Sequence, residues 1–103
     1  MHWLLQIETE LNRIQLNENP GRTRTIARRI AGIALRELYY SSGEDFLKLI
    51  QQASDDAKLP ENVRTSASRL ASRLSSNFTS PSIDPIGDAK IIVEFVKRAI
   101  DNG

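Results

Sequence analysis

The sequence predicts an all-α protein, an antiparallel bundle of four to five helices that forms a single domain over residues 1–103. Three observations lead to this fold class. Apolar residues recur every three or four positions, as on one face of a helix, and seldom alternate as they do in a strand. Short segments rich in proline, glycine, asparagine and serine separate these stretches. A chain of 103 residues, 40% of them hydrophobic, is also long enough to bury one core.

The first predicted helix ends near Asn17, and the second runs from there to about Tyr40. The segment NENPG (17–21) separates the two, and SSG (41–43) ends the second. The apolar face of the first helix consists of Trp3, Leu4, Ile7, Leu11 and Ile14. The buried arc of the second consists of Ile26, Ala27, Ile30 and Ala34, with Ile33 at its edge. Tyr39 and Tyr40 are expected to pack at its end.

A third helix is predicted from a capping box, in which Ser42 precedes Asp45 by three residues. Its apolar side consists of Phe46, Leu47, Ile50 and Ala53, and the helical spacing of apolar residues ends near Asp56. The fourth helix is predicted to have Pro60 in its first turn, where the missing N–H has no helical partner to lose. Its apolar stripe consists of Val63, Ala67, Leu70, Ala71, Leu74 and Phe78.

The last helix follows the clearest loop of the chain, TSPSIDP (79–85). Asp84 is its predicted N-cap and Pro85 its first residue. Its apolar face consists of Ile86, Ala89, Ile92, Val93, Val96, Ala99 and Ile100. Ile91 and Phe95 widen this face, so we expect this helix to be the most buried one. If Ile91 and Phe95 are not internal, a homodimer would cover them.

Residues that perform catalysis are scarce in this sequence. The single histidine is His2, close to the N-terminus, and no cysteine is present for thiolate chemistry or disulfides. No glycine-rich phosphate loop is present. Asp84 and Asp88 form a carboxylate pair able to hold a divalent cation, but Asp84 is already needed as a helix cap. We therefore predict a protein that is not an enzyme and that uses no metal and no cofactor.

Positive charge is concentrated in two stretches of the chain. Residues 19–36 and 62–83 hold eight of the fourteen cationic residues and none of the thirteen acidic ones. In the second predicted helix, Arg22, Arg29 and Arg36 recur every seven residues and form a stripe opposite the buried arc. Arg28 flanks this stripe. Arg22 and Arg24 lie at the N-terminal end of the helix, where an exposed cation is unfavourable by about 0.3–1 kcal/mol.

Three interpretations of these arginines are open. In the first, they are solvated or paired with acids of the same chain, for which the candidates are Glu44, Asp45, Asp55, Asp56 and Glu61. In the second, they bind an external anion such as RNA or a phosphorylated ligand, because a helix N-terminus offers free N–H groups to phosphate. In the third, they bind the acidic face of a partner protein. The candidate anion-binding residues are Arg22, Arg24, Arg28, Arg29 and Arg36.

Three segments resemble the HEPN family of small helical bundles. They are RRIAGIALRELY (28–39), LPENVRTSASRL (59–70) and DAKIIVEFVKRAI (88–100). The resemblance implies an up-down bundle of four to five helices that commonly dimerises and acts as a ribonuclease or as a partner of a nucleotidyltransferase. The ribonucleases of the family use an arginine followed shortly by a histidine. The segment after Arg69, LASRLSSNFTS, contains no histidine, so the resemblance implies a non-catalytic partner or binding form.

The sequence thus predicts a small helical module that works through protein–protein contact, with itself as a homodimer or with another protein. The alternative is an anion- or RNA-binding module that uses the arginine stripe. No stretch is long and apolar enough to span a bilayer. The N-terminal MHWLLQIETE lacks the features of a secretory signal. We therefore expect no membrane association and a cytoplasmic location.

Overall fold

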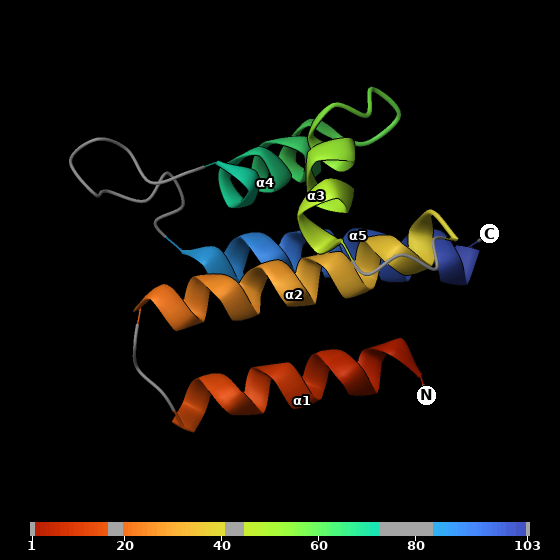
Figure 1. Ribbon diagram of the computed structural model, residues 1–103. Coiled ribbons are helices and arrows are strands. Elements are labelled where there is room, and N and C mark those ends of the chain that lie inside the picture. The colour runs from red at the N-terminus through yellow and green to blue at the C-terminus, as the bar shows by residue number, and fades with distance from the viewer. Residues whose placement is uncertain (1, 17–19, 41–44, 73–83, 103) are drawn as a thin grey trace.

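The computed structural model describes residues 2–16, 20–40, 45–72 and 84–102. This part of the chain contains five helices and no strands, which confirms the all-α prediction (Figure 1). The helices are α1 (Trp3–Leu16), α2 (Pro20–Leu38), α3 (Phe46–Ser54), α4 (Glu61–Ala71) and α5 (Pro85–Asn102). Among these described helices, none is both long enough and apolar enough to cross a membrane.

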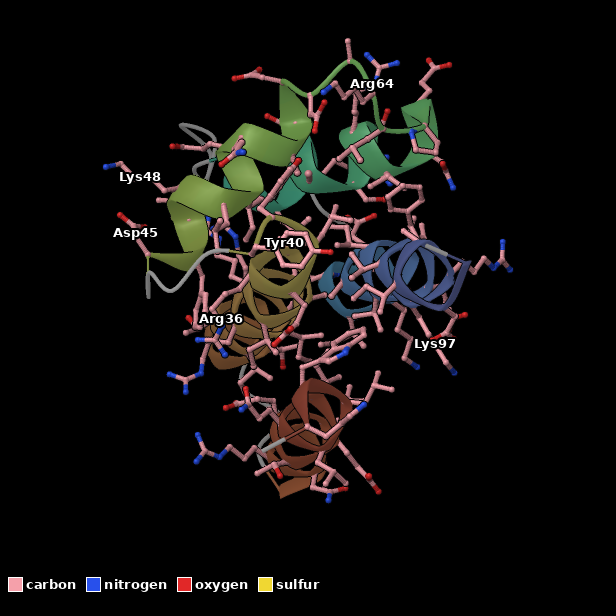
Figure 2. All side chains as sticks on the ribbon, turned by 90° about the vertical axis from the view of Figure 1, so that its right-hand side faces the viewer. Arg36, Tyr40, Asp45, Lys48, Arg64 and Lys97 are labelled. Atoms are coloured by element: carbon pink, nitrogen blue, oxygen red, sulfur yellow. The ribbon has the colours of Figure 1, made fainter. Side chains whose placement is uncertain are left out.

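Helix α2 lies at the centre of the bundle. It comes close to each of the other four helices, whereas α1 comes close to α2 alone. In Figures 1 and 2, α1 lies on one side of α2, and α3 and α4 lie on the other. Figure 1 also shows that α1 is antiparallel to α2, whereas α5 lies beside α2 and runs in the same direction. The expectation that α5 is the most buried helix is wrong, because α2 has neighbours on more sides.

The core is built around the apolar arc of α2. The buried hydrophobic residues of this helix are Ile26, Ala27, Ile30, Ala31, Ile33, Ala34 and Leu35. The predicted arc is therefore confirmed, and it extends further to Ala31 and Leu35. Three of these residues are alanines, and small side chains at a contact allow neighbouring helices to approach closely.

Helix α1 covers one side of α2 with the face predicted for it. Trp3 and Ile7 are buried, and Leu4 and Leu11 are partly buried against the core. The side chain of Ile14 lies outside the described part of the chain. Glu10 is also buried on this helix, at 5% exposure, so an acidic residue takes part in the α1–α2 contact.

The start and the buried face of α3 differ from the prediction. The helix begins at Phe46, and its N-cap is Asp45, whose carboxylate accepts a hydrogen bond from the Lys48 N–H at 3.1 Å. The predicted cap Ser42 lies outside the described residues. Leu49 is buried, whereas Leu47 is 40% exposed. Leu47 lies about 120° around the helix from the buried Ala53, which turns it away from the core.

The buried residues of α4 and α5 follow the predicted pattern closely. In α4, Val63, Ala67 and Leu70 are buried, and the helix ends at Ala71. The predicted stripe residues Leu74 and Phe78 lie outside the described residues. Pro60 immediately precedes this helix instead of lying in its first turn. In α5, the buried hydrophobic residues are Ala89, Ile92, Val93 and Val96, and Ile100 in the last turn is 42% exposed.

The two tyrosines at the end of α2 behave differently. The Tyr39 hydroxyl donates a hydrogen bond to Asp56 Oδ2 at 2.8 Å, which ties the end of α2 to the segment between α3 and α4. Tyr40 is 95% exposed (Figure 2) and has a φ of 54°, in the left-handed region that L-residues seldom adopt. Only Tyr39 packs at the helix end as predicted.

Candidate functional site

The candidate arginines of α2 do not form one continuous surface. Arg24 and Arg28 donate hydrogen bonds to α4, Arg29 pairs with α1, and Arg36 lies between α1 and α3. Arg22 lies in the first turn of α2, and its side chain is outside the described part of the chain. Of the predicted stripe, Arg29 and Arg36 face the same side of α2, and Arg22 lies outside the described side chains, whereas Arg24 and Arg28 face α4.

Arg24 and Arg28 bind the carboxyl end of α4. Arg28 donates from Nε to the Leu70 carbonyl at 2.6 Å and from Nη2 to the Ser72 carbonyl at 3.1 Å. Arg24 donates from Nη2 to the same Ser72 carbonyl. The last carbonyl groups of a helix have no intrahelical donors and carry partial negative charge. The two guanidinium groups supply both the missing donors and the opposite charge.

This contact gives Arg24 and Arg28 a structural role within the chain. Both lie beyond the first turn of α2, where the dipole of their own helix has little effect, and they lie where the negative end of α4 meets α2. Burial lowers the pKa of Arg28, and the neighbouring charge of Arg24 lowers it further. An external anion would have to compete with the α4 carbonyl groups for these two side chains.

Arg29 forms an ion pair with Glu10 of α1. Arg29 Nε and Nη2 each lie 3.2 Å from Glu10 Oε1. The Glu10 side chain is 7% exposed and that of Arg29 is 48% exposed, so the carboxylate is inside and the guanidinium is at the surface. Arg13 Nη1 lies 3.7 Å from Glu10 Oε2, an oxygen that accepts no hydrogen bond from the described residues.

The acidic partner of the arginines is thus not one that we expected. In the described structure, Asp45, Asp55, Asp56 and Glu61 make no ion pair with α2, and Glu44 lies outside the described residues. The sequence does contain a signal for Glu10. It follows Ile7 by three positions and precedes Ile14 by four, which places it on the apolar face of α1, where a charge needs a partner.

Arg36 lies where α1, α2 and α3 meet. Its Nη2 donates to Gln6 Oε1 at 3.1 Å, and its Cζ lies 5.6 Å from the centre of the Phe46 ring, within the range of a cation–π contact. Figure 2 shows Arg36 beside α2, below the first turn of α3. Gly32 makes room for Phe46, because a Cβ atom at position 32 would overlap with that side chain.

These side chains surround an open groove between α1 and α2, with α3 at one edge. The groove encloses about 610 Å³, and its lining residues are Gln6, Thr9, Glu10, Arg29, Ile33, Arg36 and Phe46. We call it the α1–α2 groove. Arg29 and Arg36 are about 10 Å apart along the helix axis at 1.5 Å per residue. The groove therefore offers two separated cations with apolar and aromatic surface near them.

The other candidate residues have structural partners. Asp88 accepts hydrogen bonds from Arg69 at 2.6, 3.1 and 3.2 Å, and this interaction raises the pKa of Arg69. Asp84 Oδ1 accepts a hydrogen bond from the Gly87 N–H at 3.0 Å, which confirms it as the cap of α5. His2 Nδ1 accepts one from the Leu4 N–H at 3.2 Å. In the described residues, no group of three potential metal ligands comes together.

No protein-family model, no curated protein and no solved structure matches this chain. The resemblance to HEPN bundles therefore stays a prediction. The all-α fold agrees with that family, but it is shared by small helical bundles in general.

Proposed function

We propose that this protein is a non-enzymatic cytoplasmic module that binds an acidic segment of a partner protein in the α1–α2 groove. The observation that carries the proposal is the presence of Arg29 and Arg36 in one groove with Phe46. The planar guanidinium group of arginine suits bidentate binding of carboxylates. Arginine and aromatic residues are also enriched at the interfaces between proteins.

Both arginines retain hydrogen-bonding capacity for a partner. A guanidinium group has five N–H donors. Arg29 directs Nε and Nη2 to one oxygen of Glu10, and Arg36 donates from Nη2 to Gln6. The other donors of the two groups make no hydrogen bond to the described residues, so a carboxylate that enters the groove could accept from them. The ion pair with Glu10 also fixes the position of Arg29, so part of the entropy of ordering this long side chain is already lost before binding.

An amphipathic helix is the partner that matches this spacing. Two acidic residues seven positions apart would repeat the separation of Arg29 and Arg36, and apolar residues between them would contact Phe46, which lines the same groove. The acidic residues would determine which segments bind, since a basic segment would place like charges together.

The same two arginines also favour a second candidate, the binding of RNA or of a phosphorylated ligand. Binding to nucleic acid draws its affinity from several cations that neutralise phosphates together. Arg24 and Arg28 already bind carbonyl groups of α4, which leaves fewer cations on this surface. For this reason we favour the acidic protein segment.

The test is fluorescence anisotropy with three labelled probes at low and physiological salt. The first is a helical peptide with two glutamates seven residues apart and leucines between them. The second has lysines in place of the glutamates, and the third is a short single-stranded RNA. We expect saturable micromolar binding of the first probe, weaker at higher salt because exposed charges are screened.

The matched variants are Arg36→Gln and Arg64→Gln. Arg36 contacts a neutral amide and a ring, so its replacement leaves no buried charge behind, and we expect it to abolish binding of the glutamate peptide. Arg64 lies on the far side of the bundle from α1 (Figure 2), so its replacement should leave binding unchanged. Equal binding of the lysine peptide, or retained binding in Arg36→Gln, would overturn the proposal. Binding of RNA alone would establish the second candidate instead.

A further inference from the structure

A second hollowed surface lies between α4 and α5, which contribute no residue to the α1–α2 groove. Two hollows of about 320 and 350 Å³ adjoin there and share Asn62 and Ile91. They form one depression, which we call the α4–α5 face. Phe95 lines it beside Ile91, and both side chains are only partly buried although they pack against the core. Apolar surface therefore remains in contact with water on this face.

The charges around this apolar surface alternate in sign. Lys90, Glu94 and Arg98 follow one another every four residues along α5, and all three line the hollow. All three are exposed, and none forms an ion pair with another described residue. Helix α4 adds Glu61 to the face. Arg69 is there as well, but its charge is paired with Asp88.

These charges balance, which distinguishes the α4–α5 face from the α1–α2 groove. Within the described residues, the acids Glu61 and Glu94 and the bases Lys90 and Arg98 make no ion pair, so two charges of each sign remain on this face. A strongly acidic or strongly basic partner would leave the charges of one sign facing like charges, which is unfavourable. A partner that matches this face carries alternating charges along a helix that runs antiparallel to α5.

We infer that the α4–α5 face binds a second copy of this chain and forms a two-fold symmetric homodimer. In such an interface, if residue i of one copy contacts residue j of the other, then j also contacts i. Two α5 helices that pack antiparallel can bring Lys90 of each copy to Glu94 of the partner subunit. The same contact covers Ile91 and Phe95 of both copies. The α1–α2 groove lies on other helices and stays open in this dimer.

The experiment is sedimentation velocity of the full chain from low to high micromolar concentration. Four proteins are compared with the wild type: Lys90→Glu, Glu94→Lys, the double exchange of both residues, and the control Lys48→Glu. Lys48 lies on α3, on the side of the bundle away from α5 (Figure 2), so the control makes the same charge change outside the face. Circular dichroism confirms that each variant keeps its helices.

We expect the wild type to dimerise, and each single exchange to raise the dimer dissociation constant about tenfold or more, because like charges then face each other. The double exchange should restore the wild-type constant, since it only reverses each ion pair, and Lys48→Glu should not change it. A wild type that stays monomeric at high micromolar concentration would overturn the inference. So would a dimer that is indifferent to the single exchanges or that is weakened by Arg36→Gln instead.

Discussion

Arg28 of α2 donates a hydrogen bond from Nε to the carbonyl oxygen of Leu70, one residue before the end of α4, at 2.6 Å. A side chain of the central helix thus completes the terminal hydrogen bonding of a neighbour. The acceptors belong to residues 42 and 44 positions further along the chain. We therefore expect Arg28 to contribute to the stability of the fold.

Replacement of Arg28 by methionine should lower the free energy of unfolding by about 1.5–3 kcal/mol, the usual contribution of a hydrogen bond to a charged group. Methionine keeps an unbranched side chain of similar length but removes every donor. Urea unfolding followed by circular dichroism measures the change. The control is Lys97→Met, which removes an exposed cation of α5. Equal loss in both variants would show that the Leu70 and Ser72 contacts add nothing specific.

Replacement of Gly32 by alanine should destabilise the protein. Alanine has the higher helix propensity, by about 1 kcal/mol, but its Cβ atom would overlap with Phe46. Overpacking of this kind costs about 1–3 kcal/mol, so the net change should be a loss. The control is the same replacement in a Phe46→Ala background, where alanine should be neutral or stabilising. A stabilised single variant would mean that Phe46 moves aside easily.

The hydrogen bond between Tyr39 and Asp56 should be visible in a titration. The Lys58 N–H and the Tyr39 hydroxyl both hold the pKa of Asp56 below its ordinary value of 3.8. A carboxyl group with a depressed pKa stabilises the fold above its unfolded pKa, and this contribution is lost as the pH falls through the folded pKa. In Tyr39→Phe, we expect the pKa of Asp56 to rise toward 3.8.

Carboxyl ¹³C NMR of Asp56 as a function of pH measures that change. The control is Tyr40→Phe, which leaves the hydroxyl of Tyr39 in place and should leave the Asp56 titration unchanged. An unchanged Asp56 pKa in Tyr39→Phe would show that the Lys58 N–H alone accounts for the depression.

Replacement of Tyr40 by glycine should stabilise the protein by about 1 kcal/mol, because an L-residue in the left-handed region pays a steric penalty that glycine avoids. Since Tyr40 is 95% exposed, little packing is lost. Thermal unfolding measures the gain. Tyr40→Ala removes the ring but keeps the Cβ atom, so it should bring no such gain. Loss of stability in the glycine variant would show that the ring makes a contact in solution.

Local sequence patterns predicted most burial and capping roles correctly where those roles depend on the residue's own helix. The arc of Ile26, Ile30 and Ala34 was predicted from periodicity alone and is buried. The start of α5 was predicted just as directly, since Asp84 and Pro85 are strong local signals. The face of α3 was partly wrong at Leu47, because a helix of nine residues offers too few positions to fix the centre of its apolar side.

Local sequence patterns could not predict the partners of the arginines. Arg28 and Arg29 are adjacent in sequence and lie about 100° apart around the helix, so they meet different neighbours. One binds backbone carbonyl groups of α4, and the other binds a carboxylate of α1. A carbonyl acceptor carries no signature in the sequence, because every residue has one.

The sequence by itself determined that this chain forms helices, and for most of them it determined which face is apolar. The reason is that helix periodicity, caps and turn residues act over a few positions. Only the tertiary structure decided that α2 is central, that Arg24 and Arg28 bind α4, and that Arg29 and Arg36 share a groove with Phe46. Those outcomes depend on the relative placement of helices distant in sequence, which results from packing of the whole core.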